Sequence, residues 1–312
     1  MRAATIRDGA IVVAEHPDPA PESGELRVRV RAAGLNGADI AQLAGNYPAP
    51  PGVPADIPGL ELAGEVEAVG DGVRRFEPGD RVMAIVAGGG QAELVVVHER
   101  VAMPVPDELD WIAAGGTPEV FTTAHDALFS QAGLALGERL LVHGAAGGVG
   151  MAAVQLGTMA GARVTATVRD PDARERIAAL GVNAIEPDGF GAHGPFDVIL
   201  ELVGAPNFPA NLEALAPRGR LCIIGVGAGA RTELDLRAVM MKRATIHGST
   251  LRARSLEDKA AAARLVEQSV LPGFASGDLA IPVAASFPLE AAADAYARFQ
   301  AGAKLGKIVL EM

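Results

Sequence analysis

The chain has 312 residues, 49% of them hydrophobic and 21% charged, which is typical of a globular protein of about two domains and excludes a disordered chain. Its formal net charge of −11 argues against nucleic acid or an anionic membrane as a partner, because such partners require a basic surface. No apolar run approaches the roughly 20 residues that span a bilayer, and the first residues carry charges and prolines where a signal peptide has an apolar core, so we expect a cytoplasmic protein.

The first part of the chain, up to about residue 117, is predicted to be rich in β-strands. Six short apolar runs alternate there with turn clusters such as 17–24 and 77–80, and this spacing indicates a small barrel or sandwich. Between the third and fourth runs lies a stretch rich in Pro, Gly and Ala, residues 34–64, that is too long for a simple connection. Because a loop of this length inside a compact domain usually lines a site, we expect it to face a ligand.

From Glu119 onward the pattern changes to alternating helices and strands. A helical segment, 122–134, leads into a strand over 140–142 and a glycine-rich turn, and a second strand follows at 163–168. Further strands and helices continue this order, a longer helix is expected over 256–271, and the chain ends in an amphipathic helix and a strand. The alternation predicts a doubly wound α/β domain with a parallel sheet.

The turn after the strand over 140–142 is predicted to bind a dinucleotide. Its sequence matches A-x-G-x-x-G, in which Gly147 allows a pyrophosphate to approach the backbone and Gly150 allows the helix to pack on its strand. The free N–H groups at the helix start, with about half a positive charge, would hold the anion. Since the full fingerprint has Gly where Ala145 stands, a tight turn in some other α/β protein is the alternative. We expect cofactor contacts from Ala146, Gly147, Gly148, Val149 and Gly150.

The end of the second strand is expected to distinguish the two nicotinamide dinucleotides. An NAD site would carry an acid there to bond the ribose 2′-hydroxyl, but the position holds Val168, followed by Arg169. The Arg169 guanidinium can form a fork with a 2′-phosphate, and Arg174, one helical turn further, could support it. Asp170 competes for the ribose, although it precedes Pro171 in a pattern typical of a helix N-cap. We therefore favour NADPH; an exposed arginine at a strand end is the alternative.

Seven segments, in order along the chain, resemble the medium-chain dehydrogenase/reductase superfamily, and within it the zinc-independent quinone oxidoreductases. They are AAGLNGADIAQLAGNYPAPPG, IPGLELAGEVEAVGDGV, FEPGDRVMA, GGGQAELVVV, HGAAGGVG, MKRATIHGSTLRARS and GKIVLE. The fourth segment and GSTLRARS are most similar to the tumour-suppressor-inducible type of quinone oxidoreductase. The resemblance implies a GroES-like β-barrel catalytic domain, residues 1–117 and 275–312, interrupted by a Rossmann NADPH-binding domain, residues 118–274. It also implies homodimers that pair the edge strands of the nucleotide-binding sheets, here ATIHGSTL.

The resemblance also indicates that no metal is bound. Zinc-dependent relatives have Cys and His ligands where this chain has Asn36 and Leu60, and neither an amide nor a leucine completes a catalytic zinc site. The six histidines are scattered without ligand spacing, and the single cysteine, Cys222, excludes a thiolate cage and an internal disulfide and is expected to be a buried, inert thiol. Glu61 and Asp39 keep the acidic positions of the family, and without a metal we expect them to bond loop N–H groups and basic side chains.

The remaining site residues are proposed beside plainer alternatives. Thr123 matches a family threonine near the nicotinamide, and is otherwise a residue at a helix start. Gly204, Gly225 and Gly227 follow strands at the carboxyl edge of the predicted sheet, where ligands bind in this fold, although turns also use glycine. Tyr47 lies in the long loop, where its ring could stack on a planar substrate; a turn tyrosine packed on the next proline is the alternative.

Three functions remain open. The first is NADPH-dependent reduction of quinones, in which hydride passes from nicotinamide to a planar small-molecule acceptor that contacts Asn36 and Tyr47. Because holding the reactants in near-attack geometry supplies about 7 kcal/mol or more of the barrier, neither zinc nor a strong acid is needed. The second is reduction of the C=C bond of an enone or enal, which also requires protonation of the other carbon. The third is a non-catalytic NADPH-binding protein, structural or redox-sensing.

Overall fold

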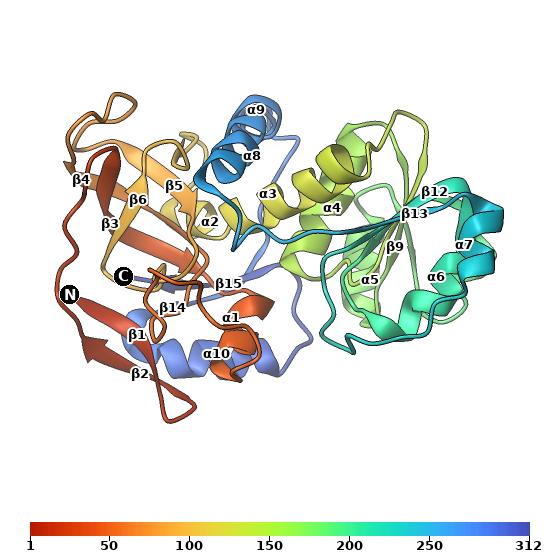
Figure 1. The fold of residues 1–312 in the computed structure, drawn as a ribbon, viewed down its shortest axis with the longest axis horizontal. Coiled ribbons are helices and arrows are strands. Elements are labelled where there is room, and N and C mark those ends of the chain that lie inside the picture. The colour runs from red at the N-terminus through yellow and green to blue at the C-terminus, as the bar shows by residue number, and fades with distance from the viewer. The chain divides into compact units, whose positions relative to one another are not determined.

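The computed structural model describes residues 1–312 and separates them into two compact units. The first unit is Met1–Thr122 together with Leu251–Met312, and the second is Thr123–Thr250. In Figure 1 the first unit contains the red-to-yellow and the blue parts of the chain, and the second contains the green-to-cyan part. None of the helices combines the length and the apolar character that crossing a membrane requires.

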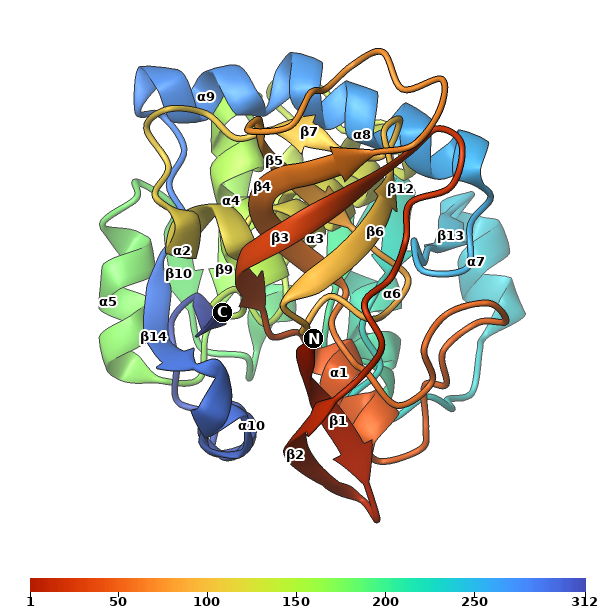
Figure 2. The same cartoon turned by 90° about the vertical axis from the view of Figure 1, so that its left-hand side faces the viewer.

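The first unit is built on β-strands, and each of the six predicted apolar runs forms one. The strands are β1 (Arg2–Arg7), β2 (Ala10–Glu15), β3 (Glu25–Gly34), β4 (Glu61–Val69), β5 (Arg81–Ile85), β6 (Leu94–His98), β7 (Met103–Pro104), β14 (Val283–Pro288) and β15 (Lys307–Glu311). Seven of them form one sheet of order β14-β15-β3-β4-β5-β7, with β6 also paired to β3 (Figure 2), while β1 and β2 form a separate hairpin. Burial alternates along β3, because Leu26, Val28 and Val30 face the core and the arginines between them face outward.

The long stretch 34–64 contains a helix that the loop-like composition does not predict. α1 (Gly37–Leu43) begins after Asn36, whose backbone N–H donates to the Asp39 carboxylate at 2.8 Å. This bond satisfies a donor at the start of the helix and turns the Asp39 side chain into the interior of the unit. The proline-rich part that follows, residues 48–58, contains neither helix nor strand.

The remaining helices of the first unit lie on both sides of the predicted domain boundaries. They are α2 (Trp111–Gly115), α8 (Leu256–Ser269), α9 (Leu271–Ser276) and α10 (Ala292–Gln300). α8 buries an alanine-rich face, and its Arg264 donates to the Ala102 carbonyl at 2.7 Å, so the helix belongs to the first unit. The compact unit that contains the parallel sheet ends at residue 250, whereas the nucleotide-binding domain was predicted to extend to residue 274. This unit starts at Thr123, which is 7% exposed and lies within α3 (Pro118–His125), and the prediction was residue 118.

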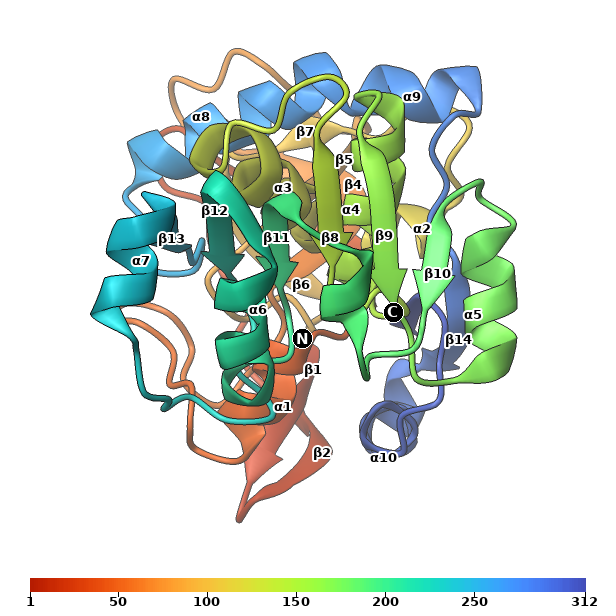
Figure 3. The ribbon, with the colours of Figure 1, turned by 90° about the vertical axis from the view of Figure 1, so that its right-hand side faces the viewer.

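The second unit is a parallel sheet of six strands with helices. The strands are β8 (Arg139–Val142), β9 (Arg163–Thr167), β10 (Asn183–Ile185), β11 (Phe196–Glu201), β12 (Leu215–Ile223) and β13 (Thr245–Gly248), and the helices are α4 (Gly148–Met159), α5 (Pro171–Ala178), α6 (Phe208–Ala214) and α7 (Leu236–Lys242). The sheet order is β10-β9-β8-β11-β12-β13, most of which Figure 3 shows side by side. The order reverses between β8 and β11, which is the point where a doubly wound sheet binds its ligand.

Short helical turns complete the chain at Asp126–Gln131, which is π-helical, and at Phe190–His193, Ala205–Asn207 and Leu289–Ala291.

Candidate functional site

The turn between β8 and α4 presents backbone groups at the start of a helix. α4 begins after Gly147, which has no side chain to cap the first N–H groups, and Ala146, Gly148 and Val149 beside it are half-buried. A Cβ at Gly147 would meet nothing closer than the Gly144 carbonyl oxygen, at 3.5 Å, so this residue leaves room for an approaching group. Because uncapped N–H groups at a helix start attract anions, the turn fits the pyrophosphate of a dinucleotide.

Gly150 has the packing role that the fingerprint assigns to its last glycine. A Cβ at this position would lie 2.6 Å from the Ala145 Cα and 2.6 Å from the Gly144 carbonyl oxygen. Both atoms belong to the backbone of the turn, so they cannot swing aside as the end of a flexible side chain would. Glycine at this position is therefore what allows α4 to start directly against the turn.

The end of β9 separates the two candidates for the ribose contact. Asp170 is the N-cap of α5 and accepts the Ala173 N–H at 2.8 Å, as predicted for its alternative role. Arg174 forms an ion pair with Glu186 at 3.0 Å. Arg169 is exposed, and no hydrogen bond or ion pair holds its guanidinium. Of these side chains, Arg169 is the one whose charge has no partner within the protein.

The loops after β11 and β12 approach each other closely. Gly204 has φ of 118°, and a Cβ there would lie 2.5 Å from the Gly229 carbonyl oxygen. At Gly225 a Cβ would collide with the Leu202 carbonyl, whereas at Gly227 nothing lies within 4 Å. Gly204 and Gly225 are therefore needed for loop packing, whether or not they also contact a cofactor, and Gly227 is free of that constraint.

A buried polar network, which was not predicted, holds the loop after β11. The Glu201 carboxylate accepts the N–H of Val203 at 2.6 Å and of Gly204 at 2.8 Å, and the side-chain amide of Asn211 at 2.6 Å. Asn211 Oδ1 in turn accepts from His143 Nε2 at 2.7 Å, and burial lowers the pKa of His143. The network fixes the sheet edge beside the switch point. The sequence feature that could have indicated this network is Glu201, a glutamate at the end of an apolar strand.

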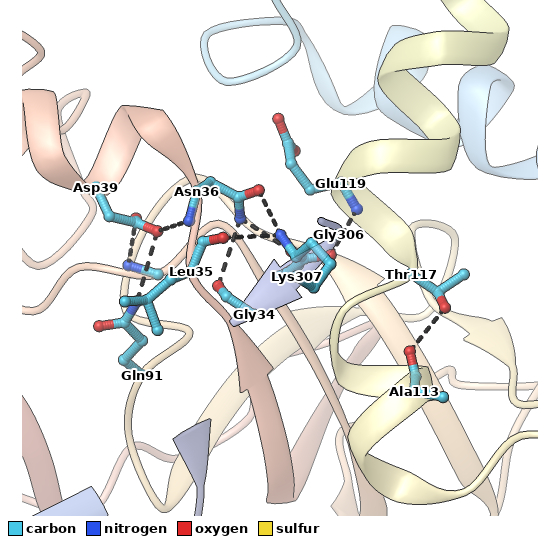
Figure 4. A network of polar contacts seen from close by, with 12 residues as sticks. Gly34, Leu35, Asn36, Asp39, Gln91, Ala113, Thr117, Glu119, Gly306 and Lys307 are labelled. Atoms are coloured by element: carbon cyan, nitrogen blue, oxygen red, sulfur yellow. Dashed lines mark hydrogen bonds and ion pairs between the residues drawn. The ribbon is translucent and has the colours of Figure 1, made fainter. Parts of the chain in front are cut away.

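In the first unit, three side chains from distant parts of the chain meet in the interior. Figure 4 shows Lys307, on β15, directed at Asn36 and the Leu35 carbonyl. Its ammonium donates to Asn36 Oδ1 at 2.7 Å, to Glu61 Oε1 at 2.5 Å and to the Leu35 carbonyl at 2.8 Å. The Asn36 amide nitrogen donates to the same Glu61 oxygen at 2.9 Å. Asn36, a predicted acceptor contact, is thus 8% exposed and held by a buried ion pair.

Glu61 and Asp39 have the structural roles expected of them in the absence of a metal. The second oxygen of Glu61 accepts the Glu119 N–H at 2.9 Å, while its first oxygen pairs with Lys307. Asp39 accepts the backbone N–H of Asn36 and, at 3.0 Å, that of Gly59. The prediction that these acids bond loop N–H groups and a basic side chain is confirmed.

The carboxyl group of Asp39 is nevertheless perturbed. Burial raises its pKa from 3.8 to about 6, against the lowering effect of the two N–H donors. The side chain of Gln91 lies next to it, and Gln91 Oε1 accepts the hydroxyl hydrogen of Tyr296 at 2.9 Å. A chain of buried polar groups therefore runs from α10 to the start of α1.

Tyr47, the second predicted acceptor contact, is held in place by Arg252. The guanidinium of Arg252 lies 4.9 Å from the centre of the Tyr47 ring and donates to the Tyr47 carbonyl at 2.8 Å. It also donates to Gln42 Oε1 at 2.6 Å and to the Ala87 carbonyl at 2.7 Å. Arg252 is buried and ties three segments of the first unit together. Arg252 lies within the segment GSTLRARS, but no motif spacing in the sequence indicated that it would hold Tyr47.

Asn36 and Leu60, the positions where the resemblance implies zinc ligands in zinc-dependent relatives, are both buried. No group of three or more His, Cys, Asp or Glu side chains in the chain could hold a metal ion. Cys222 is buried, as predicted, and burial raises its pKa to about 12, which favours the protonated thiol.

Comparison with known proteins identifies the family. Residues 22–107 match the model of the alcohol dehydrogenase GroES-like domain, and residues 148–268 match that of the zinc-binding dehydrogenases. The quinone oxidoreductase of Rattus norvegicus is 31% identical over 306 residues, covering 94% of this chain and 90% of the relative. The chain belongs to the medium-chain dehydrogenase/reductase superfamily.

Two further similar proteins have names that mention a cofactor or a type of enzyme. A mycobacterial protein whose structure is complexed with NADPH superposes with a TM-score of 0.90 at 26% identity, covering all of both chains. A phenolphthiocerol/phthiocerol polyketide synthase of Mycobacterium tuberculosis is 33% identical over 307 residues, which are 94% of this chain and 14% of that protein. The chain is therefore an oxidoreductase of the superfamily, with a GroES-like domain and a Rossmann-like nucleotide-binding domain, as predicted.

Proposed function

We propose that this oxidoreductase is an NADPH-dependent, metal-independent quinone reductase. The observation that carries the cofactor choice is the unpartnered guanidinium of Arg169 at the end of β9, where a 2′-phosphate would supply the missing anion. Asp170 competes less well, because its carboxylate already caps α5. The match to the rat quinone oxidoreductase over nearly its whole length supports the substrate class.

In the proposed reaction the chain binds the cofactor and the acceptor and positions them for hydride transfer. When bound, the nicotinamide supplies the hydride. The first N–H groups of α4 hold the pyrophosphate and Arg169 holds the 2′-phosphate. The ring of Tyr47, itself fixed by Arg252, stacks on the planar acceptor, and the Asn36 amide donates to the acceptor oxygen that gains charge.

Donation from Asn36 requires one of its amide hydrogens to be re-aimed. One hydrogen is held by Glu61 at 2.9 Å, and the other is directed at the Gly34 carbonyl at 3.4 Å. The second contact is at the upper limit of a hydrogen bond, so this hydrogen is the one that an acceptor oxygen takes at least cost.

A second candidate reaction is reduction of a C=C bond conjugated to a carbonyl. This reaction is favoured by the similarity of the chain to a stretch of a polyketide synthase, because the name of that enzyme indicates chemistry on carbon chains. It uses the same hydride but needs a proton for the other carbon. A third candidate, from a different class, is a non-catalytic NADPH-binding protein.

One experiment separates these candidates. The purified chain is supplied with NADPH or NADH and a panel of quinones, enones and enals, and cofactor oxidation is followed by absorbance. Quinone turnover with NADPH supports the proposal; enal turnover alone favours the second candidate. NADPH binding without any turnover favours the third.

Two variants test the acceptor contacts. Asn36→Ala should lower kcat with NADPH binding unchanged, and Tyr47→Ala should raise KM for bulky quinones more than for small ones. Val12→Ala, at a half-exposed position on β2, is the control. Wild-type quinone reduction by both site variants would place the acceptor elsewhere.

We also propose a cytoplasmic homodimer that pairs through the edge of the Rossmann sheet. β13 is an edge strand, bonded on one side by β12, and the neighbouring helix α7 exposes Leu236, Met240 and Met241. A second copy paired along β13 would cover these side chains. Sedimentation of the chain as a monomer at micromolar concentration would contradict the dimer.

A further inference from the structure

The ammonium of Lys307 is enclosed by acceptors. Each of its three hydrogens has an oxygen partner, at 2.5 to 2.8 Å, and the side chain is 2% exposed. Its stem runs beside the backbone of Gly116, where an added Cβ would come within 3.2 Å of the lysine Cγ. A buried ammonium with a full set of partners keeps one position, whereas a lysine at the surface samples many.

The Lys307–Glu61 pair can select between the two orientations of the Asn36 amide. An asparagine side chain can exchange its oxygen and nitrogen by a half-turn. Lysine can only donate hydrogen bonds, and an ionised glutamate can only accept them. With Lys307 on one side and Glu61 on the other, one orientation places Oδ1 on the ammonium and Nδ2 on the carboxylate, as observed. The other orientation would place like partners against each other on both sides.

We propose that Lys307 is a positioning residue, which together with Glu61 locks Asn36 with its amide nitrogen available to the acceptor. The inference rests on the proposed function, in which Asn36 donates to the acceptor oxygen. The observed orientation leaves the weakly held hydrogen, the one directed at Gly34, for that donation. In the opposite orientation an amide oxygen would take the place of the nitrogen and repel the oxygen that gains negative charge.

Lys307 also neutralises Glu61. Without the ammonium, a buried carboxylate would remain 2.9 Å from the Asn36 nitrogen and would oppose the negative charge that forms on the acceptor. The single variant Lys307→Met would therefore release the orientation of the Asn36 amide and also leave the buried Glu61 carboxylate without its partner. The unpaired charge alone could prevent folding.

The test uses the charge-balanced double variant Lys307→Met/Glu61→Gln. The glutamine keeps its single oxygen on the Glu119 N–H and turns its amide nitrogen toward Asn36, so the observed orientation of Asn36 loses the acceptor that favours it, without leaving a buried charge. Lys304→Met, which removes a neighbouring lysine that does not contact Asn36, is the control. Thermal unfolding first confirms that both variants are folded.

We expect the double variant to lose about 10- to 100-fold in kcat with quinone, the loss that follows from a misplaced contact, while its affinity for NADPH stays within about twofold. The control should keep the wild-type kcat. A folded double variant with the wild-type kcat, or one that loses NADPH affinity as strongly as kcat, would overturn the proposal.

The side-chain amide signals of Asn36 in the NMR spectrum give a second readout that needs no acceptor. In the wild-type protein they should be two resolved, exchange-protected resonances, and in the double variant they should shift and lose protection. Wild-type signals that exchange as fast as those of an exposed amide would refute the lock. If the wild-type chain reduces no acceptor, the proposed function fails, and these signals still decide whether Lys307 orients Asn36.

Discussion

Gly147, just before α4, and Gly150, in its first turn, are predicted to have separate roles in cofactor binding and in packing. Replacing Gly150 by alanine adds a methyl group 2.6 Å from two backbone atoms, where ordinary contact begins at 3.4 Å, so the helix must move by about 3.4 − 2.6 = 0.8 Å. Overpacking costs about 1–3 kcal/mol, and we take the upper end because backbone surrounds the site. Alanine regains about 1 kcal/mol of helix propensity. The net loss is about 2 kcal/mol.

Gly147→Ala should behave in the opposite way. Its methyl group meets only the Gly144 carbonyl oxygen at 3.5 Å, an ordinary contact, so stability should change by about 0.5 kcal/mol, the scale of a change at an N-cap. The same methyl group fills the space through which a pyrophosphate reaches the α4 N–H groups. We therefore expect affinity for NADPH to fall at least about tenfold, which is about 1.4 kcal/mol.

The two variants are compared by thermal unfolding without cofactor and by fluorescence titration with NADPH. Gly150→Ala should lower Tm by about 4–8 °C and Gly147→Ala by about 1–2 °C. Gly227→Ala, where nothing lies within 4 Å, controls for the added methyl group. A Gly147→Ala protein that binds NADPH like the wild type, or a Gly150→Ala protein of unchanged Tm, would refute this division of roles.

Three further predictions concern the cofactor, the metal and pH. Arg169→Ala should weaken NADPH binding by about 1.5–3 kcal/mol and hardly affect NADH binding, as measured by the two Kd values. Equal losses for both cofactors would indicate that Asp170 makes the ribose contact. Chelators should leave activity intact, and elemental analysis should find no stoichiometric zinc; one zinc per chain, lost together with activity, would contradict this. The pKa of Asp39 is raised from 3.8 to about 6, so the native state binds more protons than the unfolded chain in this window and stability falls as pH rises through it. Asp39→Asn should remove at most about 3 kcal/mol of that fall in urea unfolding between pH 4 and 7; an unchanged slope would show that Asp39 titrates normally.

Much of the fold could be predicted because its signals are local. The period of two along β3 and the strand-turn-helix pattern around Gly147 depend on residues close together in the chain. The elements that were missed are short or lie within misleading composition. β10 has three residues and little apolar pattern, and α1 lies within a Gly-, Ala- and Pro-rich stretch. The pair Asn36 and Asp39, three residues apart, was the capping signal that could have revealed α1.

The features of the candidate site can also be divided into those that the sequence predicted and those that it did not. The N-cap role of Asp170 and the structural roles of Glu61 and Asp39 were predicted from the sequence, and the structure agrees with each, whereas cofactor binding by the turn around Gly147 stays a prediction. The sequence could not show that α8 packs in the first compact unit, because a helical pattern shows which face is buried but not which unit buries it.

The order of most of the elements and the strand-turn-helix pattern around Gly147 follow from the sequence, since each depends on a few neighbouring residues. The tertiary structure alone decided how Asn36 is held. Lys307 is 271 residues away in the chain, and it reaches Asn36 because β15 pairs with β3, with Val309 opposite Gly34. A lysine at the start of an apolar strand is most often a surface residue. The pairing of two distant strands makes this one a buried partner of Glu61, and no local pattern encodes that pairing.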